Sequence, residues 1–547
     1  MRIQVTLVAV LLLSGCAGTD SAGQVFGAPA AYDIDPMPRE GLKTGGTLRW
    51  PVPEFPAQWN LTQANGARGA VDLVMRGVLP YLMRSDELGV SHPDPDYLTG
   101  TKATRNTVTY TLNPKAAWSD GTPVTYRDLA AQAAALSGRD PRFQIASATG
   151  YDQIQKVVRG RDDRQAVVTF ARPFADWAAL FSPLYPAGTD TDPAVFNRGW
   201  LNRLPETAGP FTLGAIDRTA KTITIVRDPR WWGRPAKLDA IAFRGMDAAA
   251  MPGAFANHEV DLLDIGADAD AYARVRRVKG TVMRRAGGPD WRQITFNTAS
   301  PLLDDPRVRR AITLGIDRTA IAGADLKGLG WPVRVLGNHF FMNTQKGYRD
   351  NSGDLGAYDP GRARRLLDEA GWRLHGVVRA KGARTLALRL TVPSGAPAGR
   401  QEAEIIQAML TEIGVRTEIR TVPVDDFFDR YASTGDFDLM PFSWLGNPFP
   451  VSSNQSIFAL PRGGRIQQNF ARAGSPQLDA QMSRAIEEPD PDKARALANA
   501  ADRLVWQQAS VLPLYQRPQL VACRADLANV GARGFYDLAY QDIGFSF

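Results

Sequence analysis

Apolar and polar side chains alternate along several short segments, which predicts strands with one buried face. In residues 107–112, Val108, Tyr110 and Leu112 alternate with threonines. A glycine pair, Gly45-Gly46, opens a further apolar segment and marks the expected start of ordered structure. Comparable strand patterns occur at residues 47–50, 223–225, 386–392, 415–421 and 437–444.

Helical patterns begin at recognisable caps. Asp305 precedes Pro306 and Asp359 precedes Pro360, and a capping aspartate before proline is typical of a helix start. Gly371 is expected to end the second of these helices. The expected helices carry apolar stripes at Leu129/Ala133/Leu136, Val308/Ile312/Ile316, Ala363/Leu366/Leu367/Ala370 and Ile406/Met409/Leu410/Ile413.

The order strand, helix, strand over residues 386–421 predicts a βαβ unit, and hence a largely parallel sheet. Such sheets bind ligands beyond the carboxyl ends of their strands. The strand at 437–444 would deliver Trp444, Leu445, Gly446 and Asn447 to that edge. This places a candidate ligand site there.

The N-terminus indicates export. Arg2 is followed by an apolar run, Val5 to Leu13, which is too short to span a bilayer and has the length of a signal-peptide core. The run ends in Leu13-Ser14-Gly15-Cys16, which resembles the bacterial lipoprotein signal. We therefore expect a signal peptide at 1–15, lipid on Cys16 and a flexible tether over 16–44. The alternative is an ordinary signal peptide with an incidental cysteine.

Length and charge set further limits. A chain of 547 residues exceeds a single hydrophobic core, so at least two domains are expected. The formal net charge is +7, but Lys and Arg are spread along the chain, which argues against nucleic acid as a partner.

Motifs for catalysis or cofactor binding are absent from the sequence. The four histidines are not paired for metal binding, and two cysteines exclude a four-cysteine zinc site. There is no Gly-x-Ser-x-Gly elbow, Ser-x-x-Lys or phosphate loop. We expect no cofactor, no metal and no enzyme activity.

Seven motifs follow one another along the chain. They are Trp118–Asp128 (W-x-D-G-x-P-x-T-x-x-D), Ala208–Phe211, Arg227–Gly233, Phe296–Thr298 with Asp305–Arg318, Tyr358–Gly371, Asp436–Leu439 and Leu512–Tyr515. Together they resemble the family 5 extracellular solute-binding proteins, the oligopeptide- and dipeptide-binding group, in its actinobacterial lipoprotein branch. The likeness runs from about residue 45 to about residue 520.

The resemblance implies a two-lobed α/β fold of the periplasmic-binding-protein (flytrap) type. Lobe I would cover 45–289, with an extra subdomain at about 51–190. Lobe II would cover 290–512, and residues 513–547 would return to lobe I. The lobes would close on an oligopeptide, and the closed form would dock on the permease subunits of an ABC importer. The protein would be a monomer, lipid-anchored on the extracytoplasmic face of the cell membrane.

The resemblance also suggests ligand-binding residues. In the family, a W-x-G-D segment supplies a carboxylate for the α-amino group of the peptide, and the matching stretch here ends in Asn447. Asparagine accepts a hydrogen bond but carries no charge, so free-amine anchoring is in doubt, and a blocked peptide, a siderophore-like molecule or haem stays open. The candidate ligand-binding residues are Trp59, Asn60, Trp291, Phe442, Trp444 and Asn447. Each tryptophan could instead pack in a lobe core.

Two other roles stay open. The chain could be a cell-envelope scaffold or regulatory lipoprotein that keeps the fold without transport. It could also be a secreted hydrolase, which would need a nucleophile and a base within hydrogen-bonding distance in the cleft.

Overall fold

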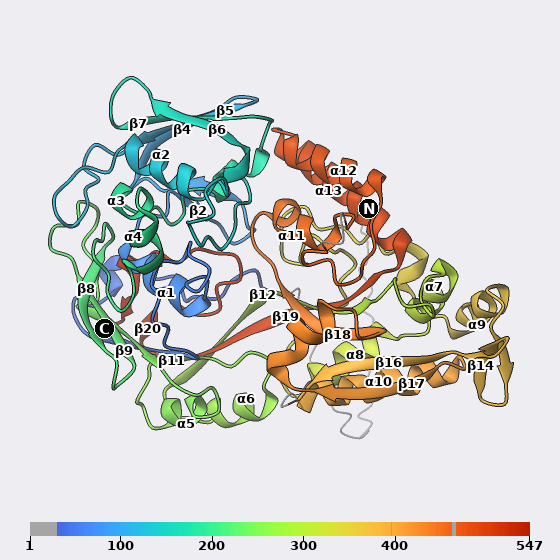
Figure 1. The fold of residues 1–547 in the computed structure, drawn as a ribbon. Helices are drawn as coiled ribbons and strands as arrows, with labels where there is room; N and C mark the ends of the chain where they lie inside the picture. Colours follow the sequence, from blue (N-terminus) through green and yellow to red (C-terminus); the bar gives the residue numbers. More distant parts are fainter. Residues whose placement is uncertain (1–29, 395–396, 462–465) are drawn as a thin grey trace, which may run out of the picture.

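A computed structural model describes residues 30–394, 397–461 and 466–547. The signal peptide and Cys16 lie outside these residues. Figure 1 shows two lobes side by side, joined by two long strands that cross between them. The two-lobed α/β fold expected from the sequence is confirmed. The residue bounds of the lobes stay a prediction.

The first lobe contains two four-stranded sheets. One has the order β1 (Thr47–Val52), β10 (Ala240–Gly245), β9 (Thr222–Arg227), β8 (Phe211–Asp217), with helix α1 (Gly69–Val78) packed on it. The other, at the top of Figure 1, has the order β4 (Leu98–Ala103), β5 (Thr107–Leu112), β7 (Gln165–Phe170), β6 (Ile154–Arg159). Alternate residues of β5 are buried, as the sequence predicted.

Helix α2 (Tyr126–Ala135) packs on β6 and β7 and begins at a capping box. The backbone N–H of Thr125 donates to the Asp128 carboxylate at 2.7 Å, and the Thr125 hydroxyl accepts from the backbone of the first turn. These bonds satisfy amides that the helix itself leaves unpaired. The helix expected from the stripe Leu129, Ala133 and Leu136 is thereby confirmed.

The second lobe is built on a six-stranded sheet. Its order is β11 (Leu262–Asp264), β19 (Val511–Arg524), β12 (Thr281–Phe296), β18 (Leu439–Leu445), β16 (Ala387–Pro393), β17 (Arg416–Val422). Only β16 pairs in parallel, with β17 and β18, so the expectation of a largely parallel sheet is wrong. The reason is that β12 and β19, the crossing strands, pair antiparallel with each other, and β12 also pairs antiparallel with β18.

The predicted βαβ unit is confirmed as β16, α10 (Pro397–Glu412) and β17. Its neighbours α7 (Pro306–Leu314) and α9 (Pro360–Glu369) begin at Asp305 and Asp359, whose carboxylates accept backbone N–H bonds of 2.8 and 2.7 Å. Gly371 adopts φ +85° just past α9, a conformation that favours glycine.

Helices α11 (Pro450–Phe458), α12 (Pro476–Glu487) and α13 (Pro491–Gln508) lie beside the β4–β7 sheet in Figure 1. Apolar side chains of these helices belong to the same buried cluster as the first-lobe core, and α12 contacts the short helix η3 (Ala175–Ala179). The lobes therefore touch in this structure.

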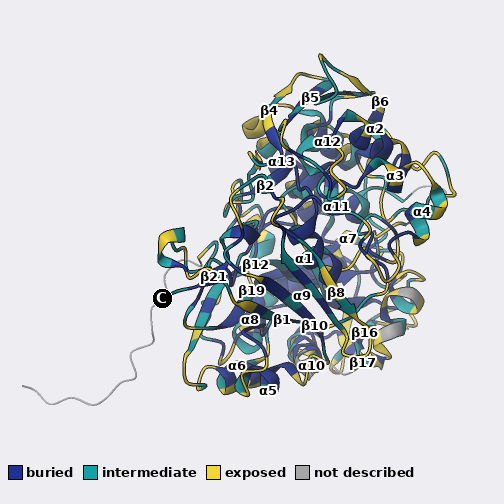
Figure 2. Cartoon of the chain, turned by 90° about the vertical axis from the view of Figure 1, so that its left-hand side faces the viewer, coloured by how far each residue is buried: buried dark blue, intermediate teal, exposed yellow. Residues whose placement is uncertain are grey.

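The shorter elements complete the chain. They are β2 (Met83–Ser85), β3 (Ser91–Pro93), α3 (Ala187–Asp190), α4 (Pro193–Arg198), α5 (Met251–Ala256), α6 (Ala269–Val275), α8 (Arg318–Asp325), β13 (Arg373–His375), β14 (Val378–Lys381), β15 (Arg384–Thr385), β20 (Leu527–Ala528), β21 (Gly544–Phe545) and the short helices η1 (Arg39–Gly41), η2 (Tyr151–Gln153), η4 (Gly353–Gly356), η5 (Val424–Asp426), η6 (Phe427–Ala432) and η7 (Tyr540–Asp542). In Figure 2 the buried residues concentrate on the strands at the centre of the molecule. Within the described ranges, no helix is both long and apolar enough to span a membrane.

Residues 31–42, which we call the N-terminal strap, fold against the C-terminal end of the chain. Asp33 donates its backbone N–H to the carbonyl of Ala532, and Ile34 and Leu42 are buried. The expected tether over 16–44 is therefore wrong for residues 31–44, and ordered structure begins before Gly45. The strap's scattered apolar side chains show no helix or strand period, so only tertiary contacts could identify it.

Candidate functional site

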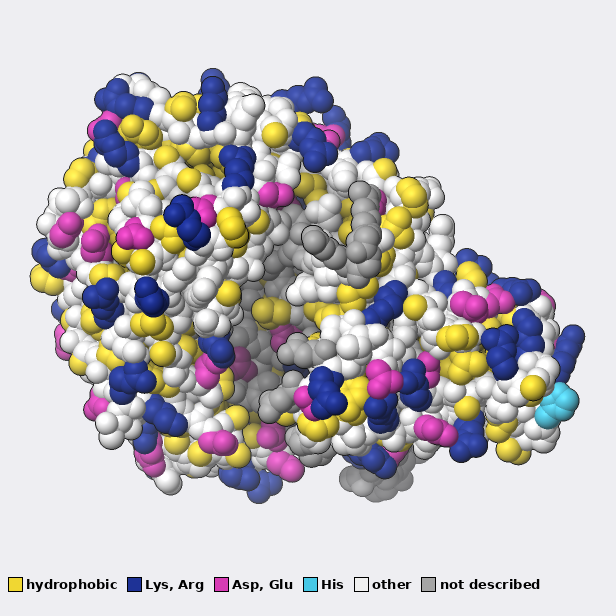
Figure 3. Space-filling view, viewed as in Figure 1, with side chains coloured by type: hydrophobic (Ala, Val, Ile, Leu, Met, Phe, Trp, Pro, Cys, Tyr) yellow, Lys and Arg dark blue, Asp and Glu magenta, His cyan; other side chains and the backbone are white. Residues whose placement is uncertain are grey.

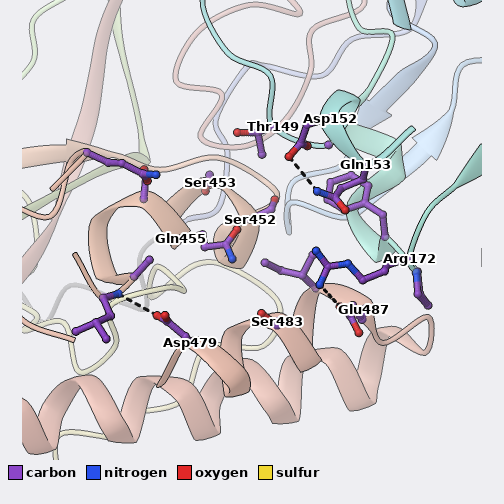
Figure 4. A pocket seen from close by; sticks show the side chains of 18 of the residues that line it. Thr149, Asp152, Gln153, Arg172, Ser452, Ser453, Gln455, Asp479, Ser483 and Glu487 are labelled. Atoms are coloured by element: carbon purple, nitrogen blue, oxygen red, sulfur yellow. Dashed lines mark hydrogen bonds and ion pairs between the residues drawn. The ribbon is translucent and has the colours of Figure 1, made fainter. Parts of the chain in front are cut away.

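An open cavity of about 790 Å³ lies between the two lobes, above the crossing strands. Figure 4 shows its two walls: one comes from residues 149–153 and 172–174 beside the β6–β7 strands, the other from α11 and α12. Figure 3 shows the same face hollowed between the lobes. Uncharged hydrogen-bonding groups contribute much of the lining, among them Thr149, Gln153, Ser452, Ser453, Gln455 and Ser483.

Polar contacts bridge the cavity from lobe to lobe. Arg172 Nη1 lies 3.9 Å from Glu487 Oε1 of α12. Close by, the Asp176 carboxylate accepts a hydrogen bond from Ser452 of α11, and burial raises the pKa of Asp176 above its ordinary value. Because the partners come from opposite lobes, separating the lobes breaks these contacts. They favour the closed form.

Reversing the charge of Arg172 should weaken this closure. In Arg172→Glu, two carboxylates face each other across the cavity, and we expect a lower population of the closed form and a few-fold loss of ligand affinity. The effect is small because both side chains are well exposed. Small-angle scattering should detect the larger mean radius. The swap Arg172→Glu/Glu487→Arg restores the pair, and failure of the swap to restore compactness would contradict this role.

A buried charge cluster lies where the crossing strands enter the second lobe. Arg292 of β12 donates from Nε to Glu402 of α10 at 2.9 Å, and the Glu402 side chain is 1% exposed. The other oxygen of Glu402 has no hydrogen-bond partner among the described residues. Tyr515 of β19 donates its hydroxyl to Asp325 of α8 at 2.9 Å. The cluster ties both crossing strands to two helices.

Asp325 is the titrating member of this cluster. Burial, followed by the nearby charge of Glu402, raises the pKa of Asp325 to about 7. In the unfolded chain an aspartate titrates near about 4. The protonated carboxyl therefore stabilises the fold at low pH, and this contribution is lost as the pH rises through the folded pKa.

The variant Asp325→Asn should consequently come close to the wild type in stability at about pH 4, near the unfolded pKa, and exceed it at about pH 8. Asparagine keeps an oxygen for the Tyr515 hydroxyl but cannot ionise. Thermal unfolding at both pH values measures the difference. Asp354→Asn, at a side chain that is 84% exposed, serves as the control. A difference that is the same at both pH values would contradict the assignment.

The structure places the predicted loop residues Trp59 and Asn60 in the first-lobe interior. Trp59 is 1% exposed and meets Phe55 edge to face. Asn60 is fully buried and donates its side-chain amide to the carbonyl of Phe196 at 3.1 Å. Asn60 therefore already has a structural partner.

The other four predicted residues lie on or next to two paired strands. Trp291 is on the crossing strand β12, Phe442 and Trp444 are on its neighbour β18, and Asn447 comes just after β18. Trp291 is fully buried, and Phe442 packs among aromatic rings. Trp444 is half-buried and stacks on Phe470, with ring centroids 5.7 Å apart. Asn447 is exposed, and its side-chain oxygen accepts the backbone N–H of Phe449 at 2.8 Å. Trp444 and Asn447 are thus the more accessible of the six.

The three predicted tryptophans share a feature with Trp118 and Trp231. The indole N–H groups of Trp59, Trp291 and Trp444 are buried without an acceptor among the described residues. A buried donor without an acceptor costs free energy, so water or a ligand oxygen is a fitting partner for each.

Sequence reasoning missed the cavity walls. Arg172, Asp176, Ser452 and Glu487 lie in no motif and come from distant parts of the chain. The local signal that could have pointed to α11 is the proline start at Pro450, shortly after the predicted Asn447.

Two α/β lobes with a cavity between them, joined by crossing strands, are the architecture of a solute-binding protein. The chain belongs to the bacterial extracellular solute-binding proteins, family 5, whose model matches residues 94–466. Along its length it is 41% identical over 555 residues to the "Oligopeptide-binding protein OppA" of Mycobacterium tuberculosis, covering 98% of this chain and 92% of that one.

Solved structures have the same fold. The "Periplasmic EDTA-binding protein EppA" superposes with a TM-score of 0.85 at 25% identity, covering 94% of this chain and 98% of that one. The oligopeptide-binding protein AppA from Bacillus subtilis, solved with a nonapeptide, gives a TM-score of 0.74 at 15% identity, covering 92% and 100%. The family resemblance seen in the sequence motifs is confirmed.

Proposed function

We propose that this chain is the solute-binding component of an ABC importer and that it captures an oligopeptide between its lobes. The observation that carries this proposal is the cavity between the lobes, lined by hydroxyl, amide and paired charged groups. Peptide groups offer donors and acceptors in equal number, which such a lining can pair. The 41% identity to an oligopeptide-binding protein supports the ligand class.

The mechanism is a population shift. Ligand that contacts both walls binds the closed form better than the open form and so raises its population. The peptide backbone would pair as an added strand, while the roomy cavity accepts varied side chains. No step of this mechanism forms or breaks a covalent bond, so the role is binding and not catalysis.

We also propose where in the cell the protein acts. Lipid on Cys16 would hold a monomer at the extracytoplasmic face of the membrane, beside the permease subunits that read the closed form. Support comes from the Leu-Ser-Gly-Cys sequence at 13–16 and from the extracellular character of the family.

Calorimetric titration with pooled and then single peptides tests the ligand class. We expect saturable one-to-one binding of peptides and weaker binding by Arg172→Glu. If no peptide gives heat but a metal chelate or haem binds one-to-one, the chain is still a solute-binding protein. Its assignment to peptides is then overturned. No binding of any small solute would favour the scaffold role.

Asn447 offers a sharper test of how the peptide is held. In Asn447→Asp the carboxylate keeps the bond to the Phe449 N–H and adds a charge. If the peptide amine reaches this loop, we expect about tenfold tighter binding of a free-amine peptide and no gain for its N-acetyl form. Equal gains for both forms would contradict amine recognition at residue 447.

A further inference from the structure

A small three-stranded sheet projects from the second lobe, at the right-hand edge of Figure 1. It consists of β13, β14 and β15, and α9 lies before it in the chain. His375 pairs with Val378, so Gly376 and Val377 form the two-residue turn at its end, with Gly376 at φ +63°. We call residues 360–385, which include α9 and this sheet, the basic tip.

Two large apolar side chains at this turn are exposed to solvent. Val377 is 78% exposed and Leu374 is 56% exposed. Turn positions usually carry Gly, Asn, Asp or Ser, so a valine at the apex has no local conformational reason. A single exposed leucine is ordinary on a protein surface, but here two exposed apolar side chains lie close together at one turn.

The basic tip is also strongly charged. It contains seven Lys and Arg residues and two acids, a formal excess of five positive charges in 26 residues, whereas the whole chain of 547 residues carries +7. Figure 3 shows Lys and Arg side chains gathered with hydrophobic ones at this end of the molecule. The tip is therefore a region of local positive excess.

Among the described residues, three of these charges form hydrogen bonds to carbonyl groups and no ion pair. Lys381 donates to the carbonyl of Ala370 at 2.9 Å, Arg384 to that of Pro301 at 3.3 Å, and Arg364 to that of Glu412 at 3.2 Å. Carbonyl groups hold the side chains in place without cancelling their charge. Asp368 is shared by Arg379 and Arg373, at 2.7 and 3.6 Å. Arg362 also pairs with Asp354 at 3.5 Å. Lys381, Arg384 and Arg364 therefore carry positive charge without an ion pair.

We propose that the basic tip docks on an anionic phospholipid surface. The apolar apex enters the headgroup region and the surrounding Lys and Arg groups pair with lipid phosphates, the combination by which peripheral elements bind membranes. The mixture of groups favours lipid over an acidic protein, because a deformable headgroup region accepts exposed apolar and cationic side chains together. Val377 and Val378 also line an open hollow of about 580 Å³ beside α10. This surface is separate from the ligand cavity, so the docking does not depend on the ligand class.

Vesicle co-sedimentation tests the proposal with the chain from residue 17 onward, which keeps every described residue and has no lipid. We expect binding to vesicles of equal phosphatidylglycerol and phosphatidylcholine, none to phosphatidylcholine alone, and loss of binding at about 1 M salt, where screening is strong. Leu374→Ser/Val377→Ser and, separately, Arg373→Gln/Arg384→Gln should each weaken binding about tenfold or more.

The matched control is Lys156→Gln/Val158→Ser on β6, which removes one exposed basic and one exposed apolar side chain elsewhere. It should bind vesicles as the wild type does, and all variants should keep wild-type thermal unfolding. Equal binding to uncharged vesicles, or wild-type binding by both tip variants, would overturn the proposal. Capture by polyglutamate without binding to anionic vesicles would also overturn it and assign the tip to an acidic protein.

Discussion

Replacing Arg284 with methionine should lower the free energy of unfolding by about 3 kcal/mol or more. The Arg284 side chain is 2% exposed and its guanidinium donates to the carbonyls of Ile34, Val530 and Leu527 and to the Asp35 carboxylate. Methionine fills similar space but leaves the carbonyls buried and unpaired. Because Ile34 and Asp35 belong to the N-terminal strap, the strap should detach from β12.

Denaturant unfolding gives the stability change, and hydrogen exchange over residues 31–42 tests the detachment. The control is Arg285→Met at the next, less buried position, where one bond to the carbonyl of Gly330 is lost and about 1 kcal/mol or less is expected. An unchanged exchange rate in the strap of Arg284→Met would show that other contacts hold it.

The second large effect concerns the pair Arg292–Glu402. Arg292→Met should cost about 3–5 kcal/mol, because it leaves the Glu402 charge buried without its cation. Removing both charges in Arg292→Met/Glu402→Leu should restore stability to within about 1 kcal/mol of the wild type, since the desolvation penalty disappears with the charges.

Thermal and denaturant unfolding of the two single variants and the double variant form a complete cycle. A double variant as unstable as Arg292→Met would mean that lost packing, and not the unpaired charge, causes the damage.

Local patterns in the sequence predicted much of the fold. Alternation identified β5, and aspartate–proline pairs located the starts of α7 and α9. Each of these signals depends on neighbours in the chain, which periodicity and capping report well. The family motifs supplied the global arrangement that no local pattern contains.

Features that depend on distant partners were not predictable. The sheet of the second lobe is mixed because β12 pairs with β19, a strand far away in the sequence. The strap is ordered because Arg284 and Ala532 bind it. Aromatic residues chosen for a cleft, such as Trp291, proved buried, since ring size favours burial as much as ligand contact. The cavity pair Arg172–Glu487 joins residues that are far apart in the sequence, so no local pattern reports it.

The central claim is that the lobes close on one solute molecule, and native mass spectrometry of the protein purified from its own host tests it most directly. We expect one discrete adduct per chain that is released on denaturation and can be sequenced as a peptide. We expect a reduced adduct in Arg172→Glu. A chain that carries no adduct after exposure to host extract, and whose thermal unfolding no peptide shifts, would contradict it.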